Sequence, residues 1–294
     1  MPAALPANAA PVRTLLRAPR PYHLMRTLSC GQAFRWRLDG EGASGIVGGR
    51  TVRLEQRRGA IAVDGPEGDG LPGAVVHYLG LDEPLRSIER ELSRDRILAR
   101  ILPQTSGIAI LRQDPWECLA SFIVSAFNNI PKIEMTIGRL SERFGDGLPG
   151  GGYAFPSPAA LAVAREGALR DCILGYRAPY VRSVARLVNS GAFDLGAAFA
   201  LSYDEAKRML LDLRGVGEKV ADCVLLFAYG KGEAFPVDVW VKRAVERWYF
   251  RGEVKTVREV RAFARRRFGD LAGYAQQHLF YHSRFRRFGS REAI

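Results

Sequence analysis

Residues 213–219 read Leu213-Arg-Gly-Val-Gly-Glu-Lys219 and lie between two segments whose apolar residues recur with helical spacing. Gly215 and Gly217 let the backbone turn tightly and approach an anion closely, and the N-terminus of the next helix adds positive potential. We therefore predict a helical hairpin at residues 209–228, in which Gly215, Val216 and Gly217 contact a phosphate. Because helix pairs also turn through glycine for packing reasons, the hairpin alone leaves phosphate binding open.

Two polar residues accompany the hairpin. Lys219 lies in the first turn of its second helix, where the helix dipole disfavours a positive charge, and Cys223 follows on the same face. Asp238 precedes another apolar-periodic segment, so we expect it to be a helix N-cap that stays ionised at neutral pH. Each residue alone also fits a structural role, as a solvated lysine and a capping aspartate. Together they place an amine and a carboxylate beside the predicted phosphate contact.

Capping patterns predict further helices on both sides of the hairpin. Ser202 with Glu205 and Thr256 with Glu259 have capping-box spacing, and Asp114-Pro-Trp-Glu117 combines an N-cap, a first-turn proline and a capping-box glutamate. Ser157-Pro158 is expected to open another helix, and Gly175 and Gly230 to lie at helix ends. Residues 106–294 are therefore predicted to be all-α, apart from a short strand-like run at 108–111.

The N-terminal part has a different pattern. Phe34-Arg-Trp-Arg-Leu38 alternates apolar and basic residues, and strand-like runs follow at 51–55 and 60–63, separated by Gly-rich and Asp-rich breaks. Residues 22–105 are thus predicted to form a small antiparallel β-sheet domain with helices. Residues 1–21, rich in Ala, Pro and Arg, are predicted to be a disordered tail. The expected class is α+β, with a small antiparallel sheet followed by a larger all-α helix–hairpin–helix region.

The composition limits the function classes. The chain has 294 residues, of which 47% are apolar, enough for a substantial core in about two domains. Its 43 Lys and Arg against 31 Asp and Glu give a net charge of +12, which is typical of proteins that contact phosphates, although an inert basic surface gives the same number. No apolar run is long enough to cross a membrane.

The cysteines and histidines do not form a metal motif. The four cysteines are far apart without a CxxC pair, which argues against a zinc or iron–sulfur site and predicts reduced, mostly buried thiols. His278 and His282 have i,i+4 spacing, but no acid or cysteine nearby completes a zinc motif. We assign no metal ligands.

These motifs together resemble a known family. The stretch 213–223, followed by Pro236-Val-Asp238, is similar to the helix–hairpin–helix, Gly/Pro-Asp (HhH-GPD) motif of base-excision DNA glycosylases, in its bifunctional 8-oxoguanine glycosylase and apurinic/apyrimidinic (AP) lyase version. The resemblance covers about residues 22–288. It also rests on matches in both regions of the chain: 31–37, 111–119, 121–123, 128–130, 174–180 and 275–280.

The resemblance implies a reaction and a lesion pocket. Lys219 would attack C1′ of an extruded nucleotide and form a Schiff base, while Asp238 would stabilise positive charge on the sugar. Cys223 and Phe280 would contact the two faces of the lesion base. Gln276 would contact its Watson–Crick edge, and Gly31 would offer a carbonyl to the N7 hydrogen that distinguishes 8-oxoguanine from guanine.

The resemblance also implies residues for the opposite strand. Tyr176 would be the strand-separating wedge, Arg177 would read the orphaned base, and Asn128 would lie in the same gap. Here the chain departs from the eukaryotic pattern, because Phe127 stands where an asparagine is expected and Lys132 where an arginine is expected. These departures predict relaxed discrimination of the opposite base, since lysine lacks the planar fork of arginine.

Further contacts to phosphates are implied for Asn129 and for Trp240, which replaces a common histidine. Arginines near the C-terminus are additional candidates. They are Arg261, Arg265, Arg266, Arg267, Arg284, Arg286 and Arg287.

The resemblance makes duplex DNA containing 8-oxoguanine the expected partner of a monomer that needs no cofactor. Related folds hold a structural cation on hairpin backbone carbonyls. The Ala/Arg/Gly-rich composition hints at a bacterial, hence cytoplasmic, protein, and a eukaryotic one would be nuclear or mitochondrial. The alternatives are an HhH-GPD glycosylase for other oxidised or alkylated bases, and a non-catalytic HhH DNA-binding module. Lys219 with Asp238 argues against mere binding, and the four pocket residues favour oxidised guanine.

Overall fold

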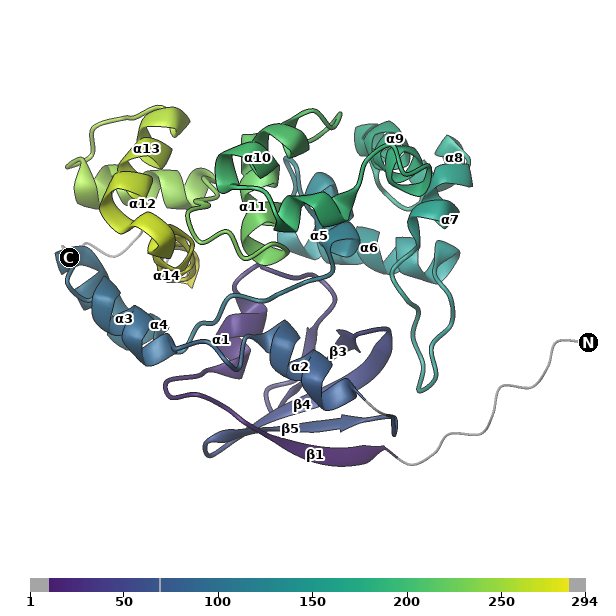
Figure 1. The fold of residues 1–294 in the computed structure, drawn as a ribbon, viewed down its shortest axis with the longest axis horizontal. Helices are drawn as coiled ribbons and strands as arrows, with labels where there is room; N and C mark the ends of the chain where they lie inside the picture. The colour runs from purple at the N-terminus through teal and green to yellow at the C-terminus, as the bar shows by residue number, and fades with distance from the viewer. Residues whose placement is uncertain (1–10, 69, 286–294) are drawn as a thin grey trace, which may run out of the picture.

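The computed structural model describes residues 11–68 and 70–285. Its antiparallel sheet has the strand order β1-β5-β4-β3-β2, and Figure 1 shows the sheet beneath a layer of helices. The fold therefore has the predicted class, a small antiparallel sheet region followed by a mostly helical one. The strands are β1 (Val12–Arg17), β2 (Arg37–Leu38), β3 (Ala43–Val47), β4 (Arg50–Arg57) and β5 (Ala60–Gly65).

The structure differs from the sequence-based expectation at three strands, β1, β2 and β3. The disordered tail predicted for residues 1–21 is wrong for 12–17, which form β1 and pair along the whole of β5; residues 1–10 lie outside the described part. The prolines on both sides of this segment argued against a strand. An edge strand tolerates such prolines, however, because one of its sides is not paired. The strand predicted at 34–38 is reduced to β2, and β3 was not predicted because Ser44 and Gly45 weaken its apolar alternation.

The helices that follow the sheet connect it to the rest of the chain. They are α1 (Leu24–Ser29), α2 (Leu71–Leu79), α3 (Leu85–Leu92) and α4 (Arg96–Thr105). Helix α2 packs against the sheet, whereas α4 packs against the final helix, α14. One continuous apolar core runs through both regions, so the sheet supports the helical layer directly.

The helical region follows the predicted caps closely. Both capping boxes, at Ser202 and at Thr256, are present, and Asp114 and Ser157 are N-caps. Glu117 differs, because its carboxylate pairs with Arg35 instead of closing a capping box. The helices are α5 (Pro115–Val124), α6 (Ile130–Phe144), α7 (Pro158–Val163), α8 (Glu166–Asp171), α9 (Ala178–Asn189), α10 (Tyr203–Leu211), α11 (Glu218–Phe227), α12 (Val239–Tyr249), α13 (Val257–Phe268) and α14 (Ala272–Phe285).

The run at 108–111 is buried but is not a strand, which corrects another expectation. Its backbone is paired by a side chain: Gln32, fully buried, donates from Nε2 to the Ala109 carbonyl (2.8 Å) and accepts from the Leu111 N–H (2.9 Å). Gln32 thus satisfies backbone groups that a neighbouring strand would otherwise pair. This link also fixes Gly31, the preceding residue, against the helical layer.

Candidate active site

The predicted hairpin connects α10 to α11. Gly215 has φ 92°, and a Cβ there would lie 2.7 Å from the ring of Tyr180, so the turn requires glycine. Gly217 is the N-cap of α11 and provides no capping side chain. The first N–H groups of α11 are therefore free of side-chain partners, as an anion contact at a helix N-terminus requires.

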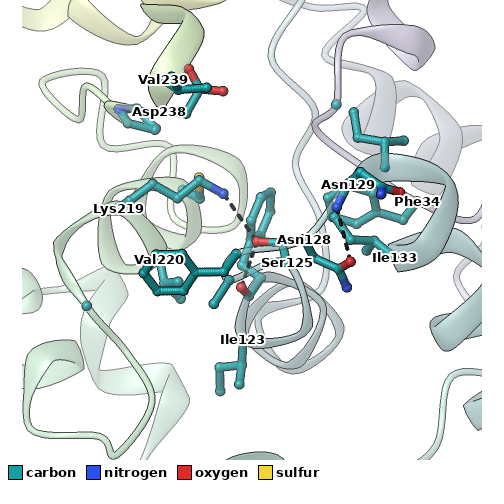
Figure 2. Close-up of a pocket in the computed structure, with 18 of the residues that line it drawn as sticks. Phe34, Ile123, Ser125, Asn128, Asn129, Ile133, Lys219, Val220, Asp238 and Val239 are labelled. Atoms are coloured by element: carbon teal, nitrogen blue, oxygen red, sulfur yellow. Dashed lines mark hydrogen bonds between the residues drawn. The ribbon is translucent and has the colours of Figure 1, made fainter. Parts of the chain in front are cut away.

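Lys219 lies in the first turn of α11, as predicted, and is half-buried. Its Nζ donates to Ser125 Oγ at the end of α5 (3.2 Å) and lies 4.9 Å from the centre of the Phe122 ring. Figure 2 shows this side chain crossing the space between the two helices. Ser125 Oγ in turn donates to the Phe122 carbonyl (2.7 Å), which fixes the hydroxyl as an acceptor for the amine.

Asp238 is the N-cap of α12 and accepts from the Val241 N–H (2.8 Å), as predicted. Burial raises the pKa of its carboxyl above the ordinary 3.8, while backbone N–H groups and the charge of Lys219 oppose part of this shift. Capping alone would lower the pKa of this carboxyl. The pKa is raised instead, because the Asp238 carboxyl is more buried than that of a usual helix cap.

Lys219 and Asp238 line one cavity of about 1010 Å³. The four residues expected around a lesion base line the same cavity, although they come from positions as far apart as 31 and 280. Cys223 is buried beside Lys219, and burial raises the pKa of its thiol to about 12, so the thiol is neutral. Gln276 is buried, and its Oε1 accepts from Gln277 Nε2 (2.6 Å).

Gly31 lies where the sheet region meets this cavity. It has φ 76°, and a Cβ would lie 3.3 Å from both Ile130 and Phe280. An L side chain would thus strain the backbone and push against the ring that faces the cavity.

We expect Gly31→Ala to lower excision of a modified base by roughly 5- to 150-fold, the effect of about 1–3 kcal/mol of strain at the pocket wall. Cleavage of a preformed AP site, which has no base to accommodate, should be retained. Single-turnover assays with both substrates measure the two effects. Gly40→Ala is the matched control, since Gly40 also has a left-handed φ (85°) but nothing within 4 Å and lies outside the cavity. Equal loss on both substrates would contradict this role.

The pKa of Asp238 predicts the pH dependence. A raised pKa means that the carboxyl keeps its proton to a higher pH, so the ionised form is lost as the pH falls through this value. As the pH is lowered, single-turnover excision should therefore decline at a higher pH than titration of an ordinary aspartate would cause. Asp238→Asn should abolish that decline, and Asp114→Asn, a change at another N-cap, should preserve it. A decline that survives in Asp238→Asn would assign it to another group.

Arg177 lines the cavity, as Tyr176 does. This side chain is buried, and its guanidinium donates to the carbonyls of Ala126 and Phe127. These bonds hold the guanidinium at the cavity wall, and reading of an orphaned base by Arg177 stays a prediction. Tyr176 and Asn128 line the cavity beside it, whereas Lys132 is exposed and does not.

The other predicted DNA contacts have mixed outcomes. Asn129 caps α6 by accepting from the Lys132 N–H (3.0 Å), and Trp240 lines the cavity. Three arginines are held by acids: Arg261 by Glu218 and Asp222, Arg265 by Asp204, and Arg267 by Asp95. Arg284 lines the cavity, and Arg286 and Arg287 lie outside the described residues.

Ser125 and Phe122 hold the Lys219 amine, and no pattern in the sequence predicts this role. Neither residue belongs to a motif typical of a catalytic or binding site. In the sequence, they therefore look like the other core residues of α5. Within residues 11–68 and 70–285, no three His, Cys, Asp or Glu side chains are grouped as a metal site would need. No helix of that part is both long and apolar enough to cross a membrane.

Comparisons with known proteins agree with this geometry. The family model of the 8-oxoguanine DNA glycosylase N-terminal domain matches residues 15–119, and that of the HhH-GPD superfamily of base excision DNA repair proteins matches residues 120–269. The chain belongs to the HhH-GPD superfamily. The two matches meet inside α5, between residues 119 and 120.

Individual HhH-GPD proteins match over most of their length. The "Probable N-glycosylase/DNA lyase" of Methanothermobacter thermautotrophicus is 35% identical over 213 residues, which cover 65% of this chain and 68% of that protein. The structure of MBOgg1 with a low-affinity DNA ligand has a TM-score of 0.89 at 35% identity, covering 93% of this chain and 96% of that one. The structure of Clostridium acetobutylicum 8-oxoguanine glycosylase/lyase, in complex with dsDNA containing cytosine opposite 8-oxoG, has a TM-score of 0.86 at 35% identity. The match covers 90% of this chain and 92% of that one.

Proposed function

We propose that this HhH-GPD protein is a bifunctional DNA glycosylase and AP lyase that removes 8-oxoguanine from duplex DNA. One observation carries the proposal: the Lys219 amine and the Asp238 carboxyl line a single cavity with Gly31, Gln276 and Phe280. A module that only bound DNA would need neither the amine nor the base-sized space. The named activities of the relatives point to the same reaction.

The chemistry follows from the type of nucleophile. The neutral amine of Lys219 attacks C1′ of the extruded nucleotide, and the base leaves with the electron pair of its glycosidic bond and takes up a proton. One proton of the amine goes to the departing base and the other to the ring oxygen O4′ as the sugar ring opens, which leaves an imine between Lys219 Nζ and C1′. Removal of a proton from C2′ then expels the 3′-phosphate and nicks the strand. The Asp238 carboxylate stabilises the positive charge that develops on the sugar.

Base selection rests on the cavity walls. In this proposal Cys223 and Phe280 hold the two faces of the base, Gln276 contacts its Watson–Crick edge, and the Gly31 carbonyl accepts from N7–H of 8-oxoguanine. Guanine would leave that carbonyl unpaired, which costs about 1–3 kcal/mol. This penalty is too small to reject the excess of normal guanine, so extrusion and the chemical step must also discriminate.

A panel of lesions and opposite bases tests the function. Single-turnover excision should be fastest for 8-oxoguanine and similar opposite all four bases, because Phe127 and Lys132 replace an amide and a guanidinium that would hydrogen-bond the opposite base. Faster excision of an alkylated base would favour the alternative glycosylase. A strong requirement for cytosine would overturn relaxed discrimination and leave the 8-oxoguanine activity standing.

Action as a monomer on duplex DNA is part of this proposal. The substrate would place the enzyme wherever the cell keeps its DNA: the bacterial nucleoid, or the nucleus or mitochondrion of a eukaryote.

A further inference from the structure

The backbone of Gly31 is held through the residues on both sides of it. The buried Cys30 thiol donates to the Thr27 carbonyl (3.1 Å), and burial raises the pKa of this thiol to about 12, so the thiol keeps its proton. On the other side, the Gln32 side chain is fully buried and hydrogen-bonded. In the part of the chain that the structure describes, no hydrogen bond is made to the Gly31 carbonyl itself. The surrounding backbone is therefore fixed, while this carbonyl is left for a base.

Gln32 anchors the peptide that contains the Gly31 carbonyl at three points. Its Nε2 donates to the Ala109 carbonyl (2.8 Å), and its Oε1 accepts from the Leu111 N–H (2.9 Å). Its own carbonyl accepts from Gln113 Nε2 (2.8 Å). The side-chain amide thus meets one acceptor and one donor of the backbone, which fixes its orientation. Because the side chain and the carbonyl of Gln32 are both held, the peptide between Gly31 and Gln32 has little freedom to rotate.

The same contacts connect Gly31 to the helix of the proposed nucleophile. The Gln113 N–H donates to the Phe227 carbonyl (2.8 Å) at the C-terminal end of α11. The segment 107–113 therefore links the carbonyl that would contact the base to the helix whose amine would attack the sugar. Neither Gln32 nor Gln113 lines the cavity, so an effect of either side chain on the base has to be exerted through Gly31.

We propose that Gln32, supported by Gln113, is a positioning residue that fixes the direction of the Gly31 carbonyl and thereby sets the discrimination between 8-oxoguanine and guanine. This role deepens the proposed function and rests on it. A hydrogen bond weakens steeply when donor and acceptor are misaligned, so a fixed peptide strengthens the contact with N7–H of the lesion. A peptide free to rotate would also let the carbonyl turn away from the bare N7 of guanine, which would lower the penalty on the normal base. Rigidity at Gln32 thus favours the lesion and disfavours guanine.

Gln32→Met tests this role, because methionine has nearly the same length but cannot bridge two backbone groups. We expect single-turnover excision of 8-oxoguanine to fall roughly 5- to 150-fold, the range for one hydrogen bond left unmade. Cleavage of a preformed AP site, which has no base, should be retained. Gln56→Met is the matched control, since Gln56 also bridges two backbone groups, accepting from the Leu24 N–H (2.8 Å) and donating to the Tyr22 carbonyl (2.6 Å), and lies outside the cavity.

A comparison of two bound bases separates positioning from a general loss of structure. 8-Methoxyguanine keeps an oxygen at C8 but has no N7 hydrogen, so it cannot donate to the Gly31 carbonyl. Binding of duplexes that contain either base is measured in the Lys219→Gln background, where excision is slow. Gln32→Met should lower the preference for 8-oxoguanine over 8-methoxyguanine roughly 5- to 150-fold, whereas a loosened fold would weaken binding of both duplexes equally. Gln113→Met, which removes only the bond to the Gln32 carbonyl, should cause a smaller loss of preference, and it serves if Gln32→Met does not fold.

An unchanged preference in both glutamine variants would overturn the positioning role, and so would equal losses on 8-oxoguanine and on AP sites. The result for the unchanged protein tests the proposed function separately. If that protein excises no 8-oxoguanine, the proposed function fails. If it excises 8-oxoguanine and Gln32→Met keeps the full preference, only the role of Gln32 is contradicted.

Discussion

Lys219→Gln should abolish strand nicking and reduce base excision by on the order of 10³-fold or more, because the glutamine amide cannot form an imine. Borohydride reduction during the reaction should covalently trap the unchanged protein on lesion-containing duplex and should trap none of the variant. Gel mobility of labelled DNA measures the trapped complex, and a binding assay on the same duplex checks that the variant still binds. The fold should be unaffected, since Lys219 Nζ donates to the Ser125 hydroxyl, a neutral acceptor that the glutamine amide can also use.

Lys255→Gln is the matched control for this change, because Lys255 pairs with Glu253 and lies outside the cavity. Trapping should be normal in this variant. Undiminished trapping of Lys219→Gln would show that another amine is the nucleophile. It would contradict the assignment of the Schiff base to Lys219.

Asp238→Asn should slow base excision by roughly 10²- to 10³-fold, the effect of removing one preorganised group that stabilises transition-state charge. Asparagine caps a helix about as well as aspartate, so α12 should remain intact. Because the folded pKa of Asp238 is raised, burial of its charged form costs stability as the pH rises through that pKa. The melting temperature at neutral pH should therefore be unchanged or higher in the variant.

Asp114→Asn changes a different N-cap outside the cavity and should leave excision intact. Normal single-turnover excision by Asp238→Asn would exclude a catalytic role for this carboxyl. Low activity together with a lowered melting temperature would instead make Asp238 a structural cap.

Local chemistry explains which parts of the fold could be predicted. Lys219 and Asp238 lie at helix starts, where glycine turns and capping residues mark the boundary within a few positions of the functional side chain. Gly31 and Phe280 are far apart in sequence, so their shared cavity could be anticipated only through the family resemblance. Strand β1 was missed because an edge strand pairs on one side and tolerates the flanking prolines that normally exclude a strand.

The carbonyl contacts of Arg177 could not be predicted from the sequence, for a different physical reason. Its partners are backbone carbonyls, which every residue has, so the sequence contains no feature that distinguishes an arginine held inside the protein from one facing DNA. The same limit applies to Ser125, whose hydroxyl matters only because α5 ends opposite Lys219. Side chains that act on the backbone of a neighbouring segment therefore have to be located by structure.

The neutral thiol of Cys223 has a consequence for the conditions under which the cavity can operate. Oxidants such as peroxide attack the thiolate form of a cysteine. Because the pKa of the Cys223 thiol is about 12, its thiolate form makes up on the order of one part in 10⁵ of the protein at neutral pH. Guanine oxidation is most frequent when oxidants are abundant, so a reactive cysteine in this position would be lost when the enzyme is most needed. Burial of Cys223 would therefore protect the cavity from oxidation under the same stress that produces the proposed substrate.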